Sequence, residues 1–237
     1  MVEGFDRYTT IDDLLKDVDV IGYLLKRDVL FKTNIKKIRG LRKIESYKHA
    51  IIEGEVFVGN NVVIQPYTYI IGPVCLMDDV CIGPGSFIRH NTFIGEGSYI
   101  GYGNEISNSI VLPDCVISHH TTISKSFVGA GTRMSTHSSL MSAMLKPSFV
   151  TAAFRNKEIF PDLITPASIS EISQIDFGSI IGDRCVIGAY ASVNPGSVME
   201  NDVIVYPGVK LPTGRYRKKT LVYIENYKSR LRSENYG

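Results

Sequence analysis

The chain has 237 residues and a formal net charge of +2, from 26 basic and 24 acidic residues. This balance gives no electrostatic basis for binding nucleic acid or an anionic membrane, while 44% hydrophobic content is enough for a packed core. No apolar run reaches the roughly 18 residues of a membrane-spanning helix, and the N-terminus lacks a signal-peptide pattern. We therefore expect a cytoplasmic protein. Its 4 cysteines are too sparse for a disulfide scaffold and are expected to be reduced.

The first 50 residues differ in pattern from the rest of the chain. Thr10 precedes an isoleucine, two aspartates and an apolar pair, which predicts an N-capped short helix from about Ile11. Because a repeat domain exposes strand edges at its ends, we expect residues 1–50 to form a capping segment. The segment LVYIENYKSRLR near the C-terminus is expected to cap the other end.

From Ile52 to Leu112, every sixth residue is a branched aliphatic. This period matches neither the 3.6 residues of a helix turn nor the alternation of a lone amphipathic strand. It fits very short strands separated by corners, where glycine and asparagine tolerate positive φ. Three hexads close a triangular coil, and coils stack about 4.8 Å apart as parallel strands do. The repeat predicts an all-β parallel solenoid with the aliphatic residues stacked inside.

The aliphatic ladder resumes at Ile181 and continues at Ile187, Val193, Met199, Val205 and Leu211. We assign residues 51–212 to the solenoid, interrupted by a long loop at about 141–177 that has no period. This loop is either a functional excursion or a disordered insertion. Residues 213–237 are expected to form a basic C-terminal tail.

The stretch IGPGSFIRHNTFIGEGSYIGYGNEISNSIVLPDCVISHHTTISKSFVG (82–129) resembles the hexapeptide-repeat acyltransferase family without a gap. The closer resemblance is to the C-terminal acetyltransferase domain of the bifunctional enzymes that make UDP-N-acetylglucosamine, and to related sugar-phosphate nucleotidylyltransferases. Residues 179–212 are similar to the later coils of that domain. The resemblance implies a left-handed parallel β-helix and a homotrimer whose active sites lie in the clefts between subunits.

The resemblance places the catalytic histidine of the family on His119 and an arginine that contacts the sugar phosphate on Arg89. Histidine suits the task of a general base because it titrates near neutral pH. The aliphatic ladder slips beside His119, where Ser118 occupies the six-residue register and Ile117 takes the apolar role. We expect this slip to open a groove there. His120 would modulate the charge of its neighbour, and a solvated corner is the alternative role for each of these residues.

Other positions depart from the family. A substrate lysine, a tyrosine and an asparagine near the acetyl group fall on Ser107, Thr122, and Ser142 or Ala153. These changes leave the identity of the acceptor open.

The C-terminal region carries the basic run GRYRKK (214–219). Residues 51–209 hold 14 acidic and 7 basic residues, whereas residues 210–237 hold 8 basic and 2 acidic ones. Since coenzyme A carries several phosphates, the cluster is expected to bind it, the alternative being a solvated charge run. The residues concerned are Arg215, Arg217, Lys218 and Lys219.

The sequence therefore predicts a transferase that uses acetyl-CoA or another acyl-CoA and acts on a sugar or sugar-phosphate acceptor. A second hypothesis is a non-catalytic β-helix partner, or a sugar-nucleotide-binding regulatory subunit, of a nucleotidylyltransferase. A remote one is a zinc protein like the γ-class carbonic anhydrases, but no HxxxxH pair is present among the histidines and no metal is expected. GAGTRM (129–134) is similar to a nucleotide-binding loop, but Val128 and Met134 continue the ladder, so we expect solenoid there.

Overall fold

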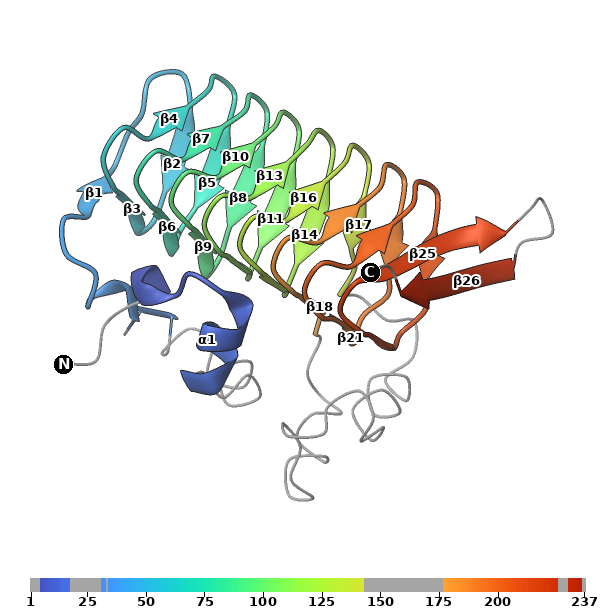
Figure 1. Ribbon diagram of the computed structural model, residues 1–237. Helices are drawn as coiled ribbons and strands as arrows, with labels where there is room; N and C mark the ends of the chain where they lie inside the picture. Colours follow the sequence, from blue (N-terminus) through green and yellow to red (C-terminus); the bar gives the residue numbers. More distant parts are fainter. Residues whose placement is uncertain (1–4, 18–30, 33, 143–176, 226–229, 236–237) are drawn as a thin grey trace.

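The computed structural model describes residues 5–17, 31–32, 34–142, 177–225 and 230–235. The chain winds into a prism with three parallel sheets, which we name A, B and C, and each coil passes through them in that order (Figure 1). Sheet C has one strand in each coil and eight strands in all. The expected fold class, an all-β, left-handed parallel β-helix of hexapeptide repeats, is confirmed.

The strands are short, as the period of six requires. Sheet A contains β1 (Arg42–Ile44), β3 (Val56–Val58), β6 (Val74–Leu76), β9 (Thr92–Ile94), β12 (Ile110–Val111), β15 (Phe127–Val128), β18 (Ser179–Ile181), β21 (Ser197–Met199) and β24 (Arg215–Tyr216). Sheet B contains β4 (Val63–Ile64), β7 (Cys81–Ile82), β10 (Tyr99–Ile100), β13 (Val116–Ile117), β16 (Arg133–Met134), β19 (Val186–Ile187), β22 (Ile204–Val205), β25 (Thr220–Glu225) and β26 (Arg230–Asn235). Sheet C contains β2 (Ile51–Glu53), β5 (Tyr69–Ile71), β8 (Phe87–Arg89), β11 (Glu105–Ser107), β14 (Thr122–Ser124), β17 (Ser139–Leu140), β20 (Ser192–Val193) and β23 (Lys210–Leu211).

The aliphatic ladder forms the inner core. Ile70, Ile88 and Ile106 lie in register on neighbouring strands and are fully buried. The predicted ladder is confirmed from Val58 to Ile106, and the second array from Ile181 to Leu211 is buried throughout. Val128 and Met134 are also in this core, so GAGTRM is a solenoid corner, as predicted.

The register changes one strand earlier than the sequence indicated. Val111, not Leu112, pairs with Ile94 and enters the inner core, while Leu112 packs in an outer cluster. The coil is one residue short at the corner between sheets C and A, around Ser109. His119 lies at a different corner, between sheets B and C. The expectation that a slip opens a groove at His119 is therefore wrong.

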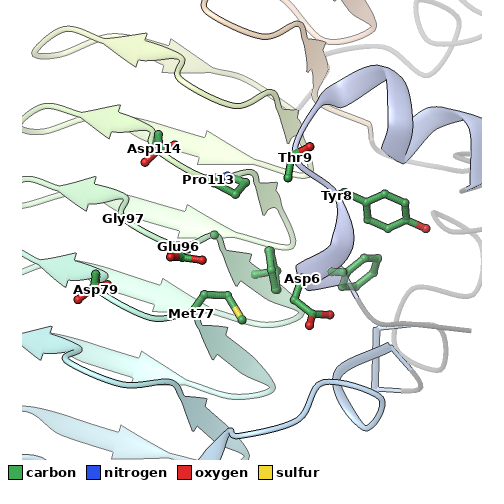
Figure 2. Close-up of a pocket in the computed structure, with 12 residues that line it drawn as sticks. Asp6, Tyr8, Thr9, Met77, Asp79, Glu96, Gly97, Pro113 and Asp114 are labelled. Carbon is green, nitrogen blue, oxygen red and sulfur yellow. The ribbon is translucent and has the colours of Figure 1, made fainter.

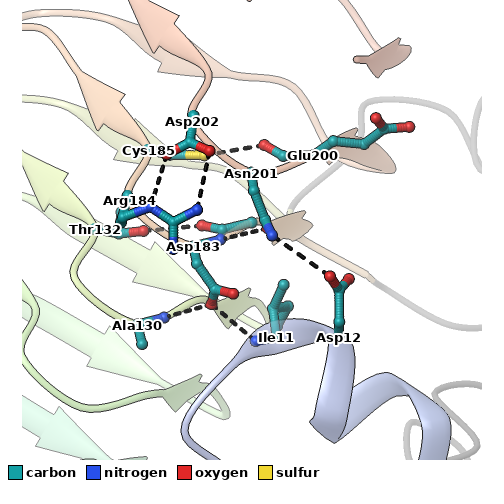
Figure 3. Close-up of polar contacts among 11 residues, drawn as sticks. Ile11, Asp12, Ala130, Thr132, Asp183, Arg184, Cys185, Glu200, Asn201 and Asp202 are labelled. Atoms are coloured by element: carbon teal, nitrogen blue, oxygen red, sulfur yellow. Dashed lines mark hydrogen bonds and ion pairs between the residues drawn. The ribbon is translucent and has the colours of Figure 1, made fainter. Parts of the chain in front are cut away.

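The N-terminal segment covers the outer face of sheet A. It includes a 3-10 helix, η1 (Phe5–Arg7), and helix α1 (Ile11–Asp17), which begins where predicted. Thr10 Oγ1 accepts the Asp13 N–H at 3.1 Å, as an N-cap residue does. Phe5 packs edge-on against Phe93 of sheet A, with ring centroids 5.7 Å apart. Polar contacts around Asp183 also join α1 to the solenoid (Figure 3).

The ends of the sheets are closed by strands rather than by α1. β1 pairs antiparallel with β3, and β26 pairs antiparallel with β25. The solenoid also continues past residue 212, because β24 pairs with β21 and β25 with β22. The six-residue register misses this coil because Tyr216 follows Leu211 by five positions. No helix in the described part of the chain is long and apolar enough to cross a membrane.

Candidate functional site

The corner between sheets B and C carries a series of rings. Its second residue has positive φ in each described coil, at Tyr67, Gly85, Gly103, His120, His137, Tyr190 and Gly208. Glycine adopts this conformation without strain, whereas a side chain with a Cβ does so at a cost. The tyrosines and histidines at this position therefore adopt a positive φ that their side chains disfavour. We call Tyr102, His119, His120 and His137 the histidine corner.

His119 and His120 both contact the Tyr102 ring. The His119 ring stacks on it at a centroid distance of 4.2 Å and an interplanar angle of 26°. The His120 ring meets it edge-on at 4.7 Å and 85°. The backbone N–H of Tyr102 also donates a hydrogen bond to His119 Nδ1 at 3.3 Å. Both imidazoles are thus held against the preceding coil.

Two glycines make room for these imidazoles. A Cβ on Gly101 would lie 2.5 Å from His119 Nδ1, and one on Gly103 would lie 2.7 Å from His120 Nδ1. Both distances are shorter than real Cβ contacts. At Gly103 a larger residue would displace the His120 ring, and at Gly101 it would displace the His119 ring and the Ser118 backbone, which lies 2.9 Å from the added Cβ. The sequence Gly-Tyr-Gly therefore forms a seat for the adjacent histidines. Sequence reasoning missed it, although the glycines on both sides of Tyr102 were visible.

His137 extends the stack. Its ring lies 5.0 Å from that of His120, nearly parallel, and 4.9 Å from that of Tyr190. A spacing of three hexads aligned His137 with His119. The coil that separates them is also one residue short, at the corner between Ile123 and Val128, so His137 aligns with His120 instead. Among the described residues, no group of three or more His, Cys, Asp or Glu side chains is arranged to hold a metal ion.

Arg89 and His119 are not brought together within one chain. Arg89 is the last residue of β8, whereas His119 precedes the first residue of β14. The two residues therefore lie at opposite ends of the sheet C strands, and two strands apart. The Arg89 guanidinium forms an ion pair of 2.7 Å with Glu105. It also lies 5.2 Å from the centre of the Phe87 ring. Contact with a ligand phosphate would compete with Glu105.

The predicted substrate residues lie at both ends of the sheet C strands, some where the strands end and Thr122 where its strand begins. Ser107 pairs in register with Arg89, and its hydroxyl lies 3.4 Å from that of Ser124. The Ser142 hydroxyl lies 2.8 Å from the same Ser124 oxygen. Thr122 is exposed near the histidine corner, at the start of β14. Ala153 lies outside the described residues.

The basic run lies on the last coil and is partly neutralised. The Arg215 guanidinium contacts the Glu200 carboxylate at 2.8 Å, and the Lys218 N–H donates to the same group at 2.9 Å. Partial burial favours the neutral acid, but these two contacts hold the pKa of Glu200 below its usual range. The Arg217, Lys218 and Lys219 side chains are exposed.

Cysteine chemistry is excluded at three positions. The four cysteines are free, as expected. Burial raises the pKa of Cys115 and Cys185 to about 12 and that of Cys75 further. These thiols therefore stay protonated at neutral pH and are poor nucleophiles.

A cavity of about 570 Å³ lies between η1 and the corner that joins sheets A and B (Figure 2). Its lining includes four carboxylates, those of Asp6, Asp79, Glu96 and Asp114. The sequence could not indicate this cavity, because one wall exists only when the N-terminal segment folds back onto sheet A. None of the predicted site residues lines it.

Comparisons with known proteins agree with the repeat. Residues 70–146 match the family model described as the GMPPB C-terminal domain. A search of curated proteins finds no match. Similar solved structures are the UDP-N-acetylglucosamine acyltransferase from Campylobacter jejuni (TM-score 0.49, 14% identity, covering 78% of this chain and 73% of that chain) and a hexapeptide transferase family protein from Anaplasma phagocytophilum (0.39, 12%, 74% and 80%). Another is a single-residue mutant of AntD, an N-acyltransferase from Bacillus cereus, in complex with dTDP and Coenzyme A (0.35, 13%, 78% and 83%). At such low identities and TM-scores, these likenesses are no basis for a functional argument.

The three parallel sheets and the six-residue ladder define a hexapeptide-repeat β-solenoid. The resemblance to that class is confirmed by these sheets and by the family-model match. The matched segment contains Arg89, Ser107 and the whole histidine corner.

Proposed function

We propose that the protein is an acyltransferase that moves an acyl group from acetyl-CoA or another acyl-CoA to a sugar or sugar-phosphate acceptor. Its reacting centre is the pair His119 and His120. One observation carries the proposal: two adjacent imidazoles are seated on glycines at a strained corner, inside the segment that matches the GMPPB C-terminal domain. At Gly103 the atoms nearest to an added Cβ all belong to the His120 ring, so this glycine makes room for the ring itself.

The chemistry needs a base and a donor. A general base takes a proton from the acceptor amine or hydroxyl, whose lone pair attacks the thioester carbonyl. A hydrogen-bond donor stabilises the negative oxygen that forms, and the C–S bond then breaks. Two imidazoles can divide these tasks, and the family resemblance gives the role of base to His119. The Tyr102 N–H is already bonded to His119 and is not available as the donor.

Assembly supplies the rest of the proposed site. The outer face of sheet B presents Val63 and Tyr99, each more than two-fifths exposed, and half-buried Val116 and Val186. These exposed apolar side chains suit packing against further copies of the chain, and closed symmetry is the rule for soluble homo-oligomers. A homotrimer would allow Arg89 of one subunit to face the histidine corner of another and orient a phosphate or carboxylate of the acceptor.

A non-catalytic sugar-nucleotide-binding partner of a nucleotidylyltransferase is the second candidate. It is favoured by the ion pair between Arg89 and Glu105, which neutralises the proposed anion-binding group, and by serine and threonine at Ser107 and Thr122. A protein of this kind would bind a nucleotide sugar but release no free coenzyme A.

Release of coenzyme A thiol from acetyl-CoA, measured over a panel of amino sugars and sugar phosphates, tests the first candidate. Transfer by the wild type and its loss in His119→Ala would support the proposal, with exposed His49→Asn as the matched control. Thermal shifts separate the candidates, because a ligand stabilises the fold in proportion to ln(1 + [L]/Kd). A melt raised by nucleotide sugars and not by acyl-CoA, with no thiol release, would overturn the acyltransferase.

A further inference from the structure

Two successive coils share one corner sequence except for a single residue. Gly83–Pro84–Gly85 and Gly101–Tyr102–Gly103 occupy the same place between sheets B and C. Pro66 and Pro207 also stand at the first position of this corner. Proline has no N–H to donate. Tyr102 therefore introduces both a ring and a backbone donor at a position where the preceding coil, with Pro84, has neither.

The added donor selects a tautomer of His119. In a neutral imidazole one nitrogen carries the proton and the other accepts hydrogen bonds. His119 Nδ1 accepts the Tyr102 N–H at 3.3 Å, and this bond favours the neutral tautomer with its proton on Nε2. Turning the ring over would place a carbon at the Nδ1 position and lose this bond. His119 consequently offers a donor at Nε2, whereas a base acting there needs a lone pair.

His120 is in the opposite situation. Its ring contacts Tyr102 and His137, but no residue in the described ranges is hydrogen-bonded to either ring nitrogen. A neutral His120 thus keeps one nitrogen with an uncommitted lone pair. The titratable side chains in contact with the His120 ring are Tyr102 and His137, and His119 contacts the same Tyr102 ring. No carboxylate of the described residues is in ring contact or hydrogen-bonded with His120.

We propose that Tyr102 is a positioning residue that fixes His119 as a hydrogen-bond donor through Nε2–H and leaves His120 as the proton acceptor of the pair. The inference rests on the proposed function and reverses the roles that the resemblance implied. His120 takes the proton from the acceptor amine or hydroxyl, and the new bond forms to the thioester carbonyl carbon. His119 stabilises the negative oxygen. The C–S bond then breaks, and the departing thiolate takes the proton from His120.

The tautomer is tested without turnover, by ¹⁵N NMR of histidine-labelled protein at a pH where the rings are neutral. His119→Asn assigns the signals. We expect His119 to show an unprotonated Nδ1 and a protonated Nε2. Tyr102→Ala removes the ring but keeps the N–H and should preserve this pattern, whereas Tyr102→Pro removes both and should give a tautomer mixture. A protonated Nδ1 in the wild type, or no difference between the two variants, would overturn the positioning role.

Roles are tested by rates of coenzyme A release. His120→Gly restores the glycine of the preceding coils, so it should fold and lose about 10²-fold or more in kcat. His119→Gln keeps a side-chain N–H donor and should be faster than His119→Ala, which should lose about 10²-fold. Wild-type activity in His120→Gly would overturn the assignment of the base. If no acceptor supports turnover, the proposed function fails, while the NMR result still decides the tautomer.

Discussion

The carboxylate of Asp183 accepts the backbone N–H of Ile11 at 2.8 Å, which joins residues 172 positions apart in the chain. The same oxygen accepts the Ala130 N–H at 2.9 Å (Figure 3). Asp183 is 2% exposed. Ile11 begins α1, whose first N–H groups have no partner within the helix. The Asp183 side chain therefore accepts one of the N–H groups at the start of α1 and attaches the N-terminal segment to the solenoid.

Removing this carboxylate should destabilise the fold. Asp183→Ala leaves the buried Ile11 N–H and the part-buried Ala130 N–H without an acceptor. Each costs about 1–3 kcal/mol, so the free energy of unfolding should fall by about 2–6 kcal/mol. Asp183→Asn retains an oxygen acceptor and should cost much less. Urea unfolding measures both variants, and equal losses would contradict this account.

The stability difference between wild type and Asp183→Asn should depend on pH. Burial raises the pKa of Asp183 above its ordinary 3.8, although the N–H groups of Ile11 and Ala130 act in the other direction. The folded state therefore binds its proton at higher pH than the unfolded state does. The wild type should lose stability relative to Asp183→Asn as pH rises through the window between 3.8 and the raised pKa. A constant difference from about pH 4 to 7 would refute it.

The sequence predicted the spine of the fold because burial repeats with the same period as the coil, as Ile88 and Ile106 show. It failed where a corner loses a residue, since Leu112 is as apolar as Val111 and only strand pairing decides which of them turns inward. The resemblance pointed to His119, and His120 was singled out as its neighbour. Their seat was not, because a glycine that makes room for a ring looks in sequence like any corner glycine.

Freeing Arg89 should strengthen binding of an anionic acceptor. Glu105→Gln keeps the shape of the side chain and removes the charge that pairs with the guanidinium at 2.7 Å. We expect the KM for a phosphate-bearing acceptor to fall several-fold, and Arg89→Ala to raise it, with little change in kcat for either. Isothermal titration with the same acceptor provides a check that needs no turnover. An unchanged Kd in both variants would remove Arg89 from the site.

The basic run should contribute long-range attraction for coenzyme A. Replacing Arg215, Arg217, Lys218 and Lys219 together by alanine should weaken binding about tenfold at low salt, and added salt should reduce this difference. Lys48→Ala, an exposed change elsewhere on the chain, is the control. The same Kd for wild type and the fourfold variant at low salt would leave the run as a solvated surface.

Self-association should depend on the outer face of sheet B. Sheet A is covered by the N-terminal segment, whereas Tyr99 and Val116 lie on a face that this described segment does not cover. Sedimentation at micromolar concentration should show a trimer. Val116→Asp should dissociate it, because the new charge would be buried at the contact. A monomeric wild type would exclude a site shared between subunits.

The interruption after β17 has a consequence for how this architecture tolerates change. The Ser142 hydroxyl contacts Ser124, and the Gly178 N–H donates to the neighbouring Lys125 carbonyl at 2.9 Å, so both sides of the interruption meet one corner. Val128 and Ile181 are paired across it as if they were one coil apart. A corner of this scaffold can therefore accept an inserted segment, because the coils before and after it still stack in the same order.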